Sequence, residues 1–420
     1  MVNIKKMTQR ARVASRSLAI LPEAAKNHAL TVLANSLFVR QDEILQANQA
    51  DIETSAKFGL DDAMIDRLRL TSDRIKGIAE DVRTVVELPD PIGKIFDQKV
   101  MPNGLHVHKQ RVPVGVLAVI YESRPNVTVD VAALALKSGN VVILRGGKET
   151  INSNKVLVNI IQTTYEQCGL NSDFVQFIDS PERSLVQELL TMYDTVDMLI
   201  PRGGSKLHQY CRENSMIPVI TGGIGICHLF VDQTADLNAA VKVIHNAKTQ
   251  RPTVCNALDT VLVHESIAKR FIPQLIERLA AANVSIRLHE NAASYCHDLF
   301  GDCVQPAREG DFDREWLSLV LGVKVVRNLE EAIEHIQEHS TGHSDGILTD
   351  TEENSDEFVR RVDSAVVYVN ASTRFTDGSQ LGLGAEVAIS TQRLHARGPM
   401  ALEELTTYKW VVRGENHIRE

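Results

Sequence analysis

Apolar and polar residues follow two different rhythms along this chain of 420 residues. Between residues 8 and 88 the apolar positions recur about every 3.6 residues, which predicts consecutive amphipathic helices. Pro89-Asp90-Pro91 ends that region, because proline interrupts the hydrogen bonds of a helix. Two short extended runs then flank Pro102-Asn103-Gly104, and Asn-Gly between β-prone runs predicts a hairpin. Such a hairpin is either an oligomerisation arm or an ordinary surface feature.

From residue 114 onward, short apolar runs alternate with helical ones. The first group predicts strands at 115–121, 140–147, 174–179 and 195–201, with helices at 128–139, 153–168 and 181–193. The rhythm restarts near residue 229, with strands at 229–232, 259–264, 323–326 and 364–370 and helices at 235–248, 266–282 and 329–338. Apolar strands separated by helices indicate parallel sheets, so we expect an α/β fold with two Rossmann-like lobes. A last strand at 406–414 could complete a sheet with the hairpin.

The composition is that of a globular protein large enough for two cores, with 44% hydrophobic and 24% charged residues. No apolar run approaches the roughly 20 residues that cross a bilayer. A net charge of −9 argues against nucleic-acid binding, which needs clustered cations. The six cysteines are scattered, which favours a reducing compartment. The first twenty residues carry cations and no acid, as transit segments do, but they also suit an ordinary helix, so we expect a cytoplasmic protein.

Two glycine-bearing junctions in the first lobe each follow a predicted strand. One is Arg145-Gly146-Gly147-Lys148, and the other is Arg202-Gly203-Gly204-Ser205, which opens a helix. Exposed amides, small residues and nearby cations suit a phosphate group, although each junction alone could be a plain turn. Their presence in one lobe favours a nucleotide ligand even though G-x-G-x-x-G is absent. Arg145 and Lys148 also suit the 2′-phosphate of NADP.

Cys255 has the setting of a reactive thiol. Lys248 and Arg251 precede it, and we expect a helix to begin after it; both features lower the pKa of a thiol. The other five cysteines have no consistent reactive setting.

The segment from His335 to His339 fits the H-x-x-E-H pattern of some metallopeptidases. His343 adds a third imidazole nearby. Three fixed positions are a weak signal in a long chain, and no other metal-site pattern accompanies them. We therefore expect no metal here.

Several stretches resemble the aldehyde dehydrogenase superfamily and, within it, the family of γ-glutamyl phosphate reductases, also called glutamate-5-semialdehyde dehydrogenases. The main ones are 112–149, PRGGSKL at 201–207, VITGGIGICH at 219–228 and the run 326–347, with further matches at 382–391 and 395–400. The run 326–347 is similar to the reductases' own signature and contains the histidines discussed above, which weakens the metal interpretation further.

The resemblance implies a role for each matching residue. Cys255 matches the superfamily's nucleophile, and Arg145 stands where the superfamily has a lysine on the adenosine side of the cofactor. Gly203, Gly204 and Ser205 match the turn that approaches the pyrophosphate. Glu315 matches the glutamate that holds the nicotinamide ribose.

Two positions depart from the superfamily. Thr221, which lies 34 residues before Cys255 (255 − 221), stands where oxidative members have a water-activating glutamate. The asparagine of the oxyanion hole is also missing, with Glu122 nearest to its place. Without this asparagine, backbone amides near Cys255 must provide more of the stabilisation of the oxyanion.

The implied reaction is the NADPH-dependent reduction of L-glutamyl 5-phosphate in proline biosynthesis. The Cys255 thiolate displaces phosphate to form a thioester, which hydride reduces to L-glutamate 5-semialdehyde. Thr221 would then protect the thioester from hydrolysis. Two alternatives stay open: an NAD(P)-dependent semialdehyde dehydrogenase that makes a free acid, and a non-catalytic nucleotide-binding relative.

The run from Glu122 to Asn126 follows a predicted strand, where ligands of α/β sheets bind. We expect Glu122, Arg124 and Asn126 to contact the charged substrate. The alternative is that these residues form salt bridges on the surface.

The resemblance also implies a division of the chain. We expect a cofactor-binding domain over 1–97 and 113–228 and a catalytic domain over 229–384. An oligomerisation arm and C-terminal segment would cover 98–112 and 385–420. The hairpin arm and the last strand suggest a homo-oligomer, and the lability of the acyl phosphate suggests functional coupling to the glutamate 5-kinase that makes it.

Overall fold

The computed structural model describes residues 2–57, 62–222, 224–295 and 303–419. The chain divides into two compact units. The first comprises Met1–Thr221, Gly382–Ala388 and Pro399–Glu420, and the second comprises Gly222–Leu381 and Ile389–Gly398. Each unit has its own parallel sheet, so the predicted α/β fold with two Rossmann-like lobes is confirmed.

The first unit begins with the predicted helical region. Its helices are α1 (Ile4–Leu18), α2 (Glu23–Val39), α3 (Gln41–Lys57), α4 (Asp62–Leu68) and α5 (Ser72–Glu87). Side-chain oxygens of Asn3 and Thr71 cap α1 and α5 by accepting hydrogen bonds from the backbone of the first turn. After α5 the backbone turns extended at Leu88, immediately before Pro89.

Four parallel strands form the sheet of the first unit in the order β5-β4-β3-β6. The strands are β3 (Val116–Tyr121), β4 (Val141–Gly146), β5 (Val175–Phe177) and β6 (Met198–Arg202). The helices that follow them are α6 (Asn126–Lys137), α7 (Ile151–Gln167), α8 (Arg183–Leu190) and α9 (Ser205–Asn214), with short 3₁₀ turns η1 (Lys148–Thr150) and η2 (Ser172–Phe174). The strand order reverses direction between β3 and β6, and ligands of open α/β sheets bind at such a switch point.

Two buried lysines attach the helical region to α6. The Lys137 ammonium donates to Asn27 Oδ1 at 2.7 Å and to the Val86 carbonyl at 3.0 Å. The Lys26 ammonium pairs with Asp90 and donates to the Lys137 carbonyl at 3.0 Å. Because a buried cation must keep its partners, these contacts fix the position of α2 against α6.

Seven parallel strands form the sheet of the second unit in the order β10-β9-β11-β8-β7-β12-β13. The strands are β7 (Cys227–Val231), β8 (Leu258–His264), β9 (Ser285–Leu288), β10 (Val304–Pro306), β11 (Val320–Val326), β12 (Ser344–Leu348) and β13 (Val366–Val369). The helices are α10 (Leu237–Thr249), α11 (Glu265–Ala280), α12 (Glu290–Ala293), α13 (Leu329–His339) and α14 (Glu352–Arg361), with 3₁₀ turns η3 (Asp311–Asp313) and η4 (Thr373–Phe375). A large apolar core lies between the sheet and the helices α10 and α11.

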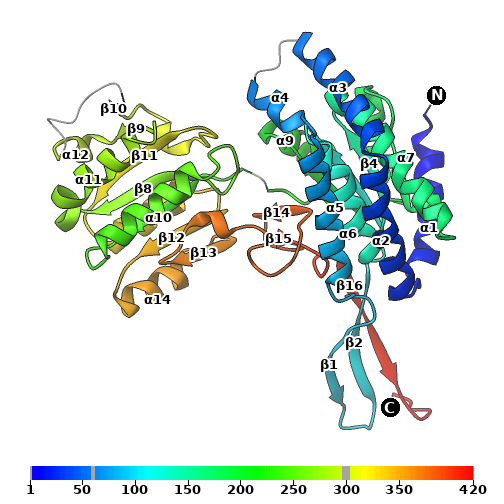
Figure 1. Ribbon diagram of the computed structural model, residues 1–420. Coiled ribbons are helices and arrows are strands. Elements are labelled where there is room, and N and C mark those ends of the chain that lie inside the picture. The colour runs from blue at the N-terminus through cyan, green and yellow to red at the C-terminus, as the bar shows by residue number, and fades with distance from the viewer. Residues whose placement is uncertain (1, 58–61, 223, 296–302, 420) are drawn as a thin grey trace. The chain divides into compact units, whose positions relative to one another are not determined.

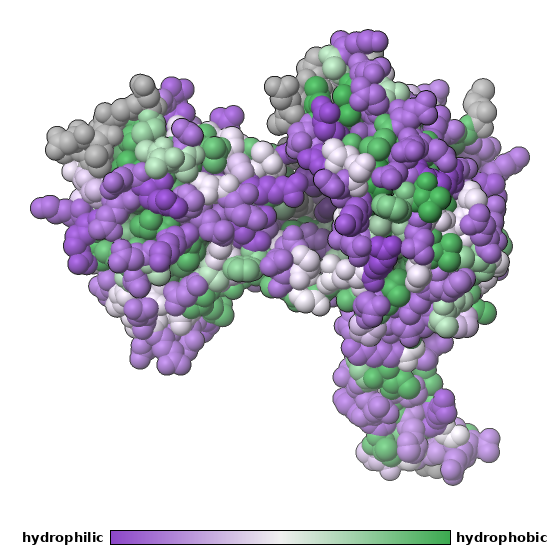
Figure 2. Space-filling view, in the orientation of Figure 1, coloured by the Kyte–Doolittle hydropathy of each residue, from purple (hydrophilic) through white to green (hydrophobic). Residues whose placement is uncertain are grey.

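The predicted hairpin and the predicted last strand form one antiparallel sheet, which projects as an arm from the first unit (Figure 1). Its strands are β1 (Ile95–Val100), β2 (His106–Pro113) and β16 (Thr406–Arg413), with β2 in the middle. The Lys109 ammonium lies 4.6 Å from the ring centre of Tyr408 and 5.0 Å from that of Trp410. Hydrophobic residues lie among hydrophilic ones on the arm's surface (Figure 2), and the Trp410 residue is 58% exposed. A two-stranded sheet of β14 (Ala388–Ser390) and β15 (Gly398–Met400) completes the fold.

Candidate active site

A cavity of about 760 Å³ lies in the first unit at the carboxyl ends of its strands. Three residues predicted from the sequence line it: Glu122, Arg145 and Lys148. Arg183 and Lys206 line it as well. Arg183 begins the predicted helix at 181–193, where no local pattern distinguished it from a surface charge. The cavity therefore brings together cations from three different helix or turn starts.

Arg145 is the most deeply placed cation of this cavity. It is the penultimate residue of β4 and donates through Nη2 to the Pro181 carbonyl at 3.2 Å, whereas its Nε is buried without a hydrogen-bond partner in the described structure. Burial lowers the pKa of Arg145, and the positive charge of Arg183 lowers it further. A buried donor without a partner suits a ligand that brings an acceptor.

The glycine turn after β6 meets the end of β3. Glu122 Oε2 accepts a hydrogen bond from the Gly204 amide at 3.0 Å, and Gly204 is the N-cap residue of α9. A side chain at Gly203 would place its Cβ 2.3 Å from the same carboxylate oxygen. Ser205 is the first residue of α9. A carboxylate on this helix start shows that the turn attracts anions, which fits the predicted pyrophosphate site.

The backbone at Ser123 is strained beside this cavity, with φ of 45°. Glu149 Oε1 holds it by accepting from the Ser123 amide at 2.8 Å and from its hydroxyl at 2.9 Å. The sequence does not reveal this role of Glu149, because nothing in its surroundings links it to a residue 26 positions earlier.

Arg124 and Asn126 lie at the start of α6 and are half-buried. The Asn126 amide donates to Asp130 Oδ2 at 2.8 Å. Burial raises the pKa of Asp130 to about 7. In this structure Asn126 thus contacts a neighbouring carboxyl group, and the expected contact of Glu122, Arg124 and Asn126 with substrate stays a prediction.

In the second unit, Cys255 lies half-buried in the turn between α10 and β8. No helix begins directly after Cys255, because the next element is the strand β8, which begins at Leu258; the expected helix start after Cys255 is wrong. Lys248 does not supply a free charge either: it is buried and its ammonium lies 3.2 Å from Asp259 Oδ1. Of the two cations that the sequence predicts near Cys255, Arg251 is the exposed one.

A tightly packed loop at residues 224–226 lies against Cys255. A Cβ at Gly225 would lie 1.6 Å from the Cys255 carbonyl oxygen, so only glycine fits there. Glu315 Oε1 accepts from the Gly225 amide at 2.9 Å, and the Thr341 hydroxyl donates to the Ile224 carbonyl at 2.8 Å. The structure thus brings Glu315 to the backbone that touches the nucleophile. Gly223 of the Thr221-Gly222-Gly223 segment lies outside the described residues.

Cys227, at the start of β7, donates from its thiol to the Cys255 carbonyl at 3.3 Å. Burial raises the pKa of Cys227 well above its ordinary value, and it raises the pKa of Cys211 to about 11. Burial also raises the pKa of Cys168. These three thiols stay protonated at neutral pH, as inert cysteines do. The described cysteines form no disulfide, and Cys296 lies outside the described residues.

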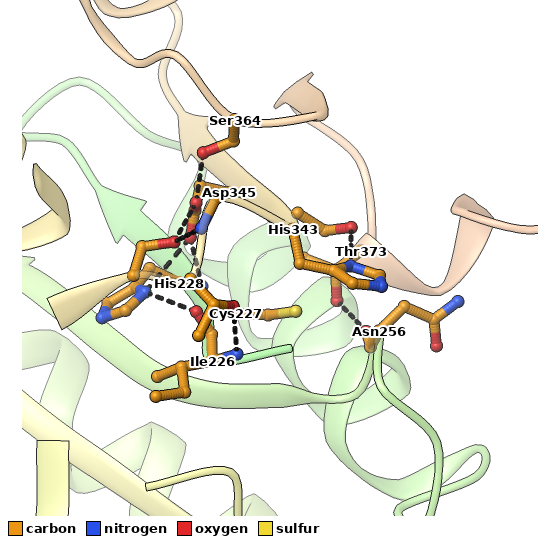
Figure 3. Close-up of polar contacts among 12 residues, drawn as sticks. Ile226, Cys227, His228, Asn256, His343, Asp345, Ser364 and Thr373 are labelled. Carbon is orange, nitrogen blue, oxygen red and sulfur yellow. Dashed lines mark hydrogen bonds and ion pairs between the residues drawn. The ribbon is translucent and has the colours of Figure 1, made fainter. Parts of the chain in front are cut away.

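A buried polar network lies beneath the same loop (Figure 3). Asp345 Oδ1 accepts from the His228 amide at 2.9 Å and lies 3.1 Å from its ring Nδ1. The hydroxyls of Ser340 and Ser364 donate to the other oxygen of Asp345. The network holds β12 beside β7 although β12 begins with polar residues.

The histidines of the H-x-x-E-H segment pack as aromatic rings. The ring centres of His335 and His339 lie 4.3 Å apart, and the His335 ring meets Phe312 edge-on at 5.5 Å. Within the described ranges no group of three or more His, Cys, Asp or Glu side chains could hold a metal ion. Within this segment His335 and Ile336 belong to the buried side of α13, whereas Gln337 and Glu338 are exposed.

The burial of His335 makes the second unit sensitive to acid. Burial lowers the pKa of His335 to about 2, while an unfolded histidine has a pKa near 6.5. Below pH 6.5 the unfolded state therefore binds the extra proton, and folding stability decreases by roughly 1.4 kcal/mol per pH unit. We expect His335→Gln to reduce the loss of unfolding free energy between pH 6.5 and 5 by about 2 kcal/mol in urea titrations.

The control for this prediction is His28→Gln, because His28 is exposed on α2. Equal pH slopes for wild type and His335→Gln would contradict the prediction.

Residues 2–293 match the aldehyde dehydrogenase family model, and the chain belongs to this family. It is similar over its whole length to proteins named γ-glutamyl phosphate reductase. It is 54% identical over 418 residues to that of Psychromonas ingrahamii, with 100% of both chains covered. The identity to that of Aliivibrio fischeri is 53% over 418 residues, again with 100% of both covered. The crystal structure of the γ-glutamyl phosphate reductase of Thermotoga maritima matches with a TM-score of 0.96 and 46% identity, covering 100% of each chain.

These similarities confirm the resemblance and the aldehyde dehydrogenase-like fold. They make the protein an oxidoreductase of a family whose members use nicotinamide cofactors. Among the described residues, no helix is both long enough and apolar enough to cross a membrane.

Proposed function

We propose that this chain reduces L-glutamyl 5-phosphate to L-glutamate 5-semialdehyde and phosphate with NADPH, as a step of proline biosynthesis. The observation that carries the proposal is the full-length similarity to γ-glutamyl phosphate reductases, together with Cys255 in a tightly supported turn. The reaction begins when the Cys255 thiolate attacks the acyl carbon and forms a C–S bond. The C–O bond to phosphate breaks, and phosphate leaves with the electron pair.

The chain's own residues then protect and position the acyl group. Thr221 places a hydroxyl where oxidative relatives have a carboxylate base, so the thioester is not hydrolysed. NADPH, when bound, would supply the hydride for reduction of the thioester carbonyl. The C–S bond then breaks, which releases the aldehyde and returns the thiolate.

The cavity of the first unit supports NADPH as the cofactor. The buried Nε of Arg145 lacks a partner among the described residues, and at Gly203 the turn packs so closely against Glu122 that a Cβ would collide with its carboxylate. Arg145, Lys148 and Arg183 would hold the 2′-phosphate and the adenosine side. The Gly204 amide and Ser205 would hold the pyrophosphate once Glu122 releases the turn. Glu315 would hold the nicotinamide ribose.

The charges next to the cavity also suit the substrate. Arg124 would bind the α-carboxylate or the phosphate of the substrate, Glu122 would bind its α-ammonium group, and Asn126 would act as a neutral hydrogen-bond donor.

The exposed apolar residues of the arm support a homo-oligomer. The acyl phosphate is labile, which favours functional coupling to the glutamate 5-kinase that makes it. The reduced cysteines fit a cytoplasmic location.

The reverse reaction gives the sharpest test. We expect the purified protein to reduce NADP with L-glutamate 5-semialdehyde only when phosphate is present, because phosphate must cleave the thioester. NAD should support a lower kcat/KM, since it lacks the 2′-phosphate that the cations bind. The measurement is NADPH or NADH absorbance, with and without phosphate.

Each alternative gives a different result in the same assay. A semialdehyde dehydrogenase that makes a free acid would reduce NADP without phosphate. A non-catalytic relative would show no cofactor reduction under any condition. Either outcome would overturn the proposal.

A further inference from the structure

A cation from a distant part of the sequence contacts both ends of the Cys255 turn. Arg374 lies in η4, and its guanidinium spans the turn from one end to the other. Its Nε donates to Gln250 Oε1 at 2.7 Å, and its Nη1 donates to Asn256 Oδ1. Gln250 follows α10, and Asn256 directly follows Cys255. One side chain therefore sets the separation of the two ends of the turn.

The backbone around Arg374 reinforces this contact. The Asn256 side-chain amide donates to the Thr376 carbonyl at 2.9 Å. The Thr373 hydroxyl donates to the Asn256 carbonyl at 2.7 Å (Figure 3). Asn256 is buried. The residue next to the nucleophile is thus fixed by the η4 segment through both its side chain and its backbone.

The charge of Arg374 is only weakly compensated. Both of its hydrogen-bond acceptors are neutral amide oxygens, and in the described part of the chain it forms no ion pair within 4.0 Å. Lys248, by contrast, is neutralised by Asp259. Burial lowers the pKa of Arg374, and the Arg251 charge lowers it too, whereas Asp377 and the Cys255 thiolate raise it. Since this interaction is mutual, the guanidinium favours the Cys255 thiolate.

We propose that Arg374 is a positioning residue that fixes the Cys255 turn through Gln250 and Asn256 and stabilises the Cys255 thiolate. The inference deepens the proposed function, because it names the group that prepares the nucleophile. The other titratable groups around the turn are Arg251 on the turn itself, Cys227 on β7, Glu315 before β11 and Asp377 after η4.

The test is the pH dependence of Cys255 alkylation by iodoacetamide in the full-length protein, followed by mass spectrometry of the Cys255 peptide. We expect Arg374→Gln to raise the alkylation midpoint by about one pH unit, so that alkylation at neutral pH slows roughly tenfold. Arg374→Lys keeps the charge and should shift the midpoint less. Arg251→Gln is the matched control for a nearby exposed cation, and its shift should be smaller than that of Arg374→Gln.

A second pair of variants covers the case in which Arg374→Gln does not fold. Gln250→Glu places a carboxylate on the exposed side of the guanidinium and should also raise the midpoint. Asn246→Glu adds the same charge one turn earlier on α10, at an exposed position, and should leave the midpoint nearly unchanged.

An unchanged midpoint in Arg374→Gln or in Gln250→Glu would overturn the inference, as would an equal shift in Arg251→Gln. The readout needs no substrate. A failure of this inference is therefore distinct from a failure of the proposed reaction, which the phosphate-dependent assay reports.

Discussion

Replacing Cys255 by serine is expected to lower semialdehyde oxidation and acyl-phosphate reduction by on the order of 10⁴-fold or more. The reason is chemical: a cysteine in this turn can be a thiolate near neutral pH, whereas a serine hydroxyl needs a positioned base to become a nucleophile. The electrostatic setting around Arg374 favours a thiolate but offers no gain to a neutral hydroxyl.

The measurement pairs steady-state turnover with intact-protein mass after exposure to acyl phosphate without cofactor. Wild type should gain the mass of one glutamyl group, and Cys255→Ser should not. Cys168→Ser makes the same chemical change at the end of α7 and should behave as wild type. If Cys255→Ser retained turnover within tenfold of wild type, the thioester route would be refuted.

The substitution Thr221→Glu is expected to make the protein hydrolyse its Cys255 thioester intermediate. A positioned base accelerates a proton-transfer step by about 10² to 10⁴, and hydrolysis of the thioester should increase over that range. With L-glutamate 5-semialdehyde and NADP but no phosphate, wild type should form almost no NADPH. Thr221→Glu should form NADPH continuously and accumulate glutamate.

Thr221→Gln is the control, because it has nearly the size of glutamate but cannot accept a proton from water. Phosphate-independent NADPH formation should distinguish the two variants clearly. The same low rate in both would show that the hydroxyl at 221 does not explain the protection of the thioester.

Most of the fold could be predicted because burial leaves a regular mark on the sequence. Every residue of β3 and of β8 is buried, and both strands stood out, β3 as a continuous apolar run and β8 through the shorter apolar run at 261–263. β12 did not, although it lies inside the sheet between β7 and β13. Ser344 and Asp345 are fully buried there, and hydrogen bonds from distant residues offset the cost of burying them. No local pattern shows that such partners exist.

Some features of the candidate site could likewise be predicted from the local sequence, and others could not. Cys255 and the glycine turns were recognisable from the residues beside them. The source of charge at Cys255 was not: Lys248 is close in sequence but pairs with Asp259, while Arg374 lies 119 positions away (374 − 255). The assigned roles of the ten predicted site residues stay predictions, since contacts within the chain do not report contacts with a ligand.

The arm has a consequence for how the chain is made. Its central strand β2 ends at Pro113, and its third strand β16 begins at Thr406, so 292 residues separate them (406 − 113 − 1). During translation, β2 therefore emerges from the ribosome long before β16 can cover its free edge. Until then that edge is open to stray pairing with other nascent chains, and chaperone protection should matter most in this interval.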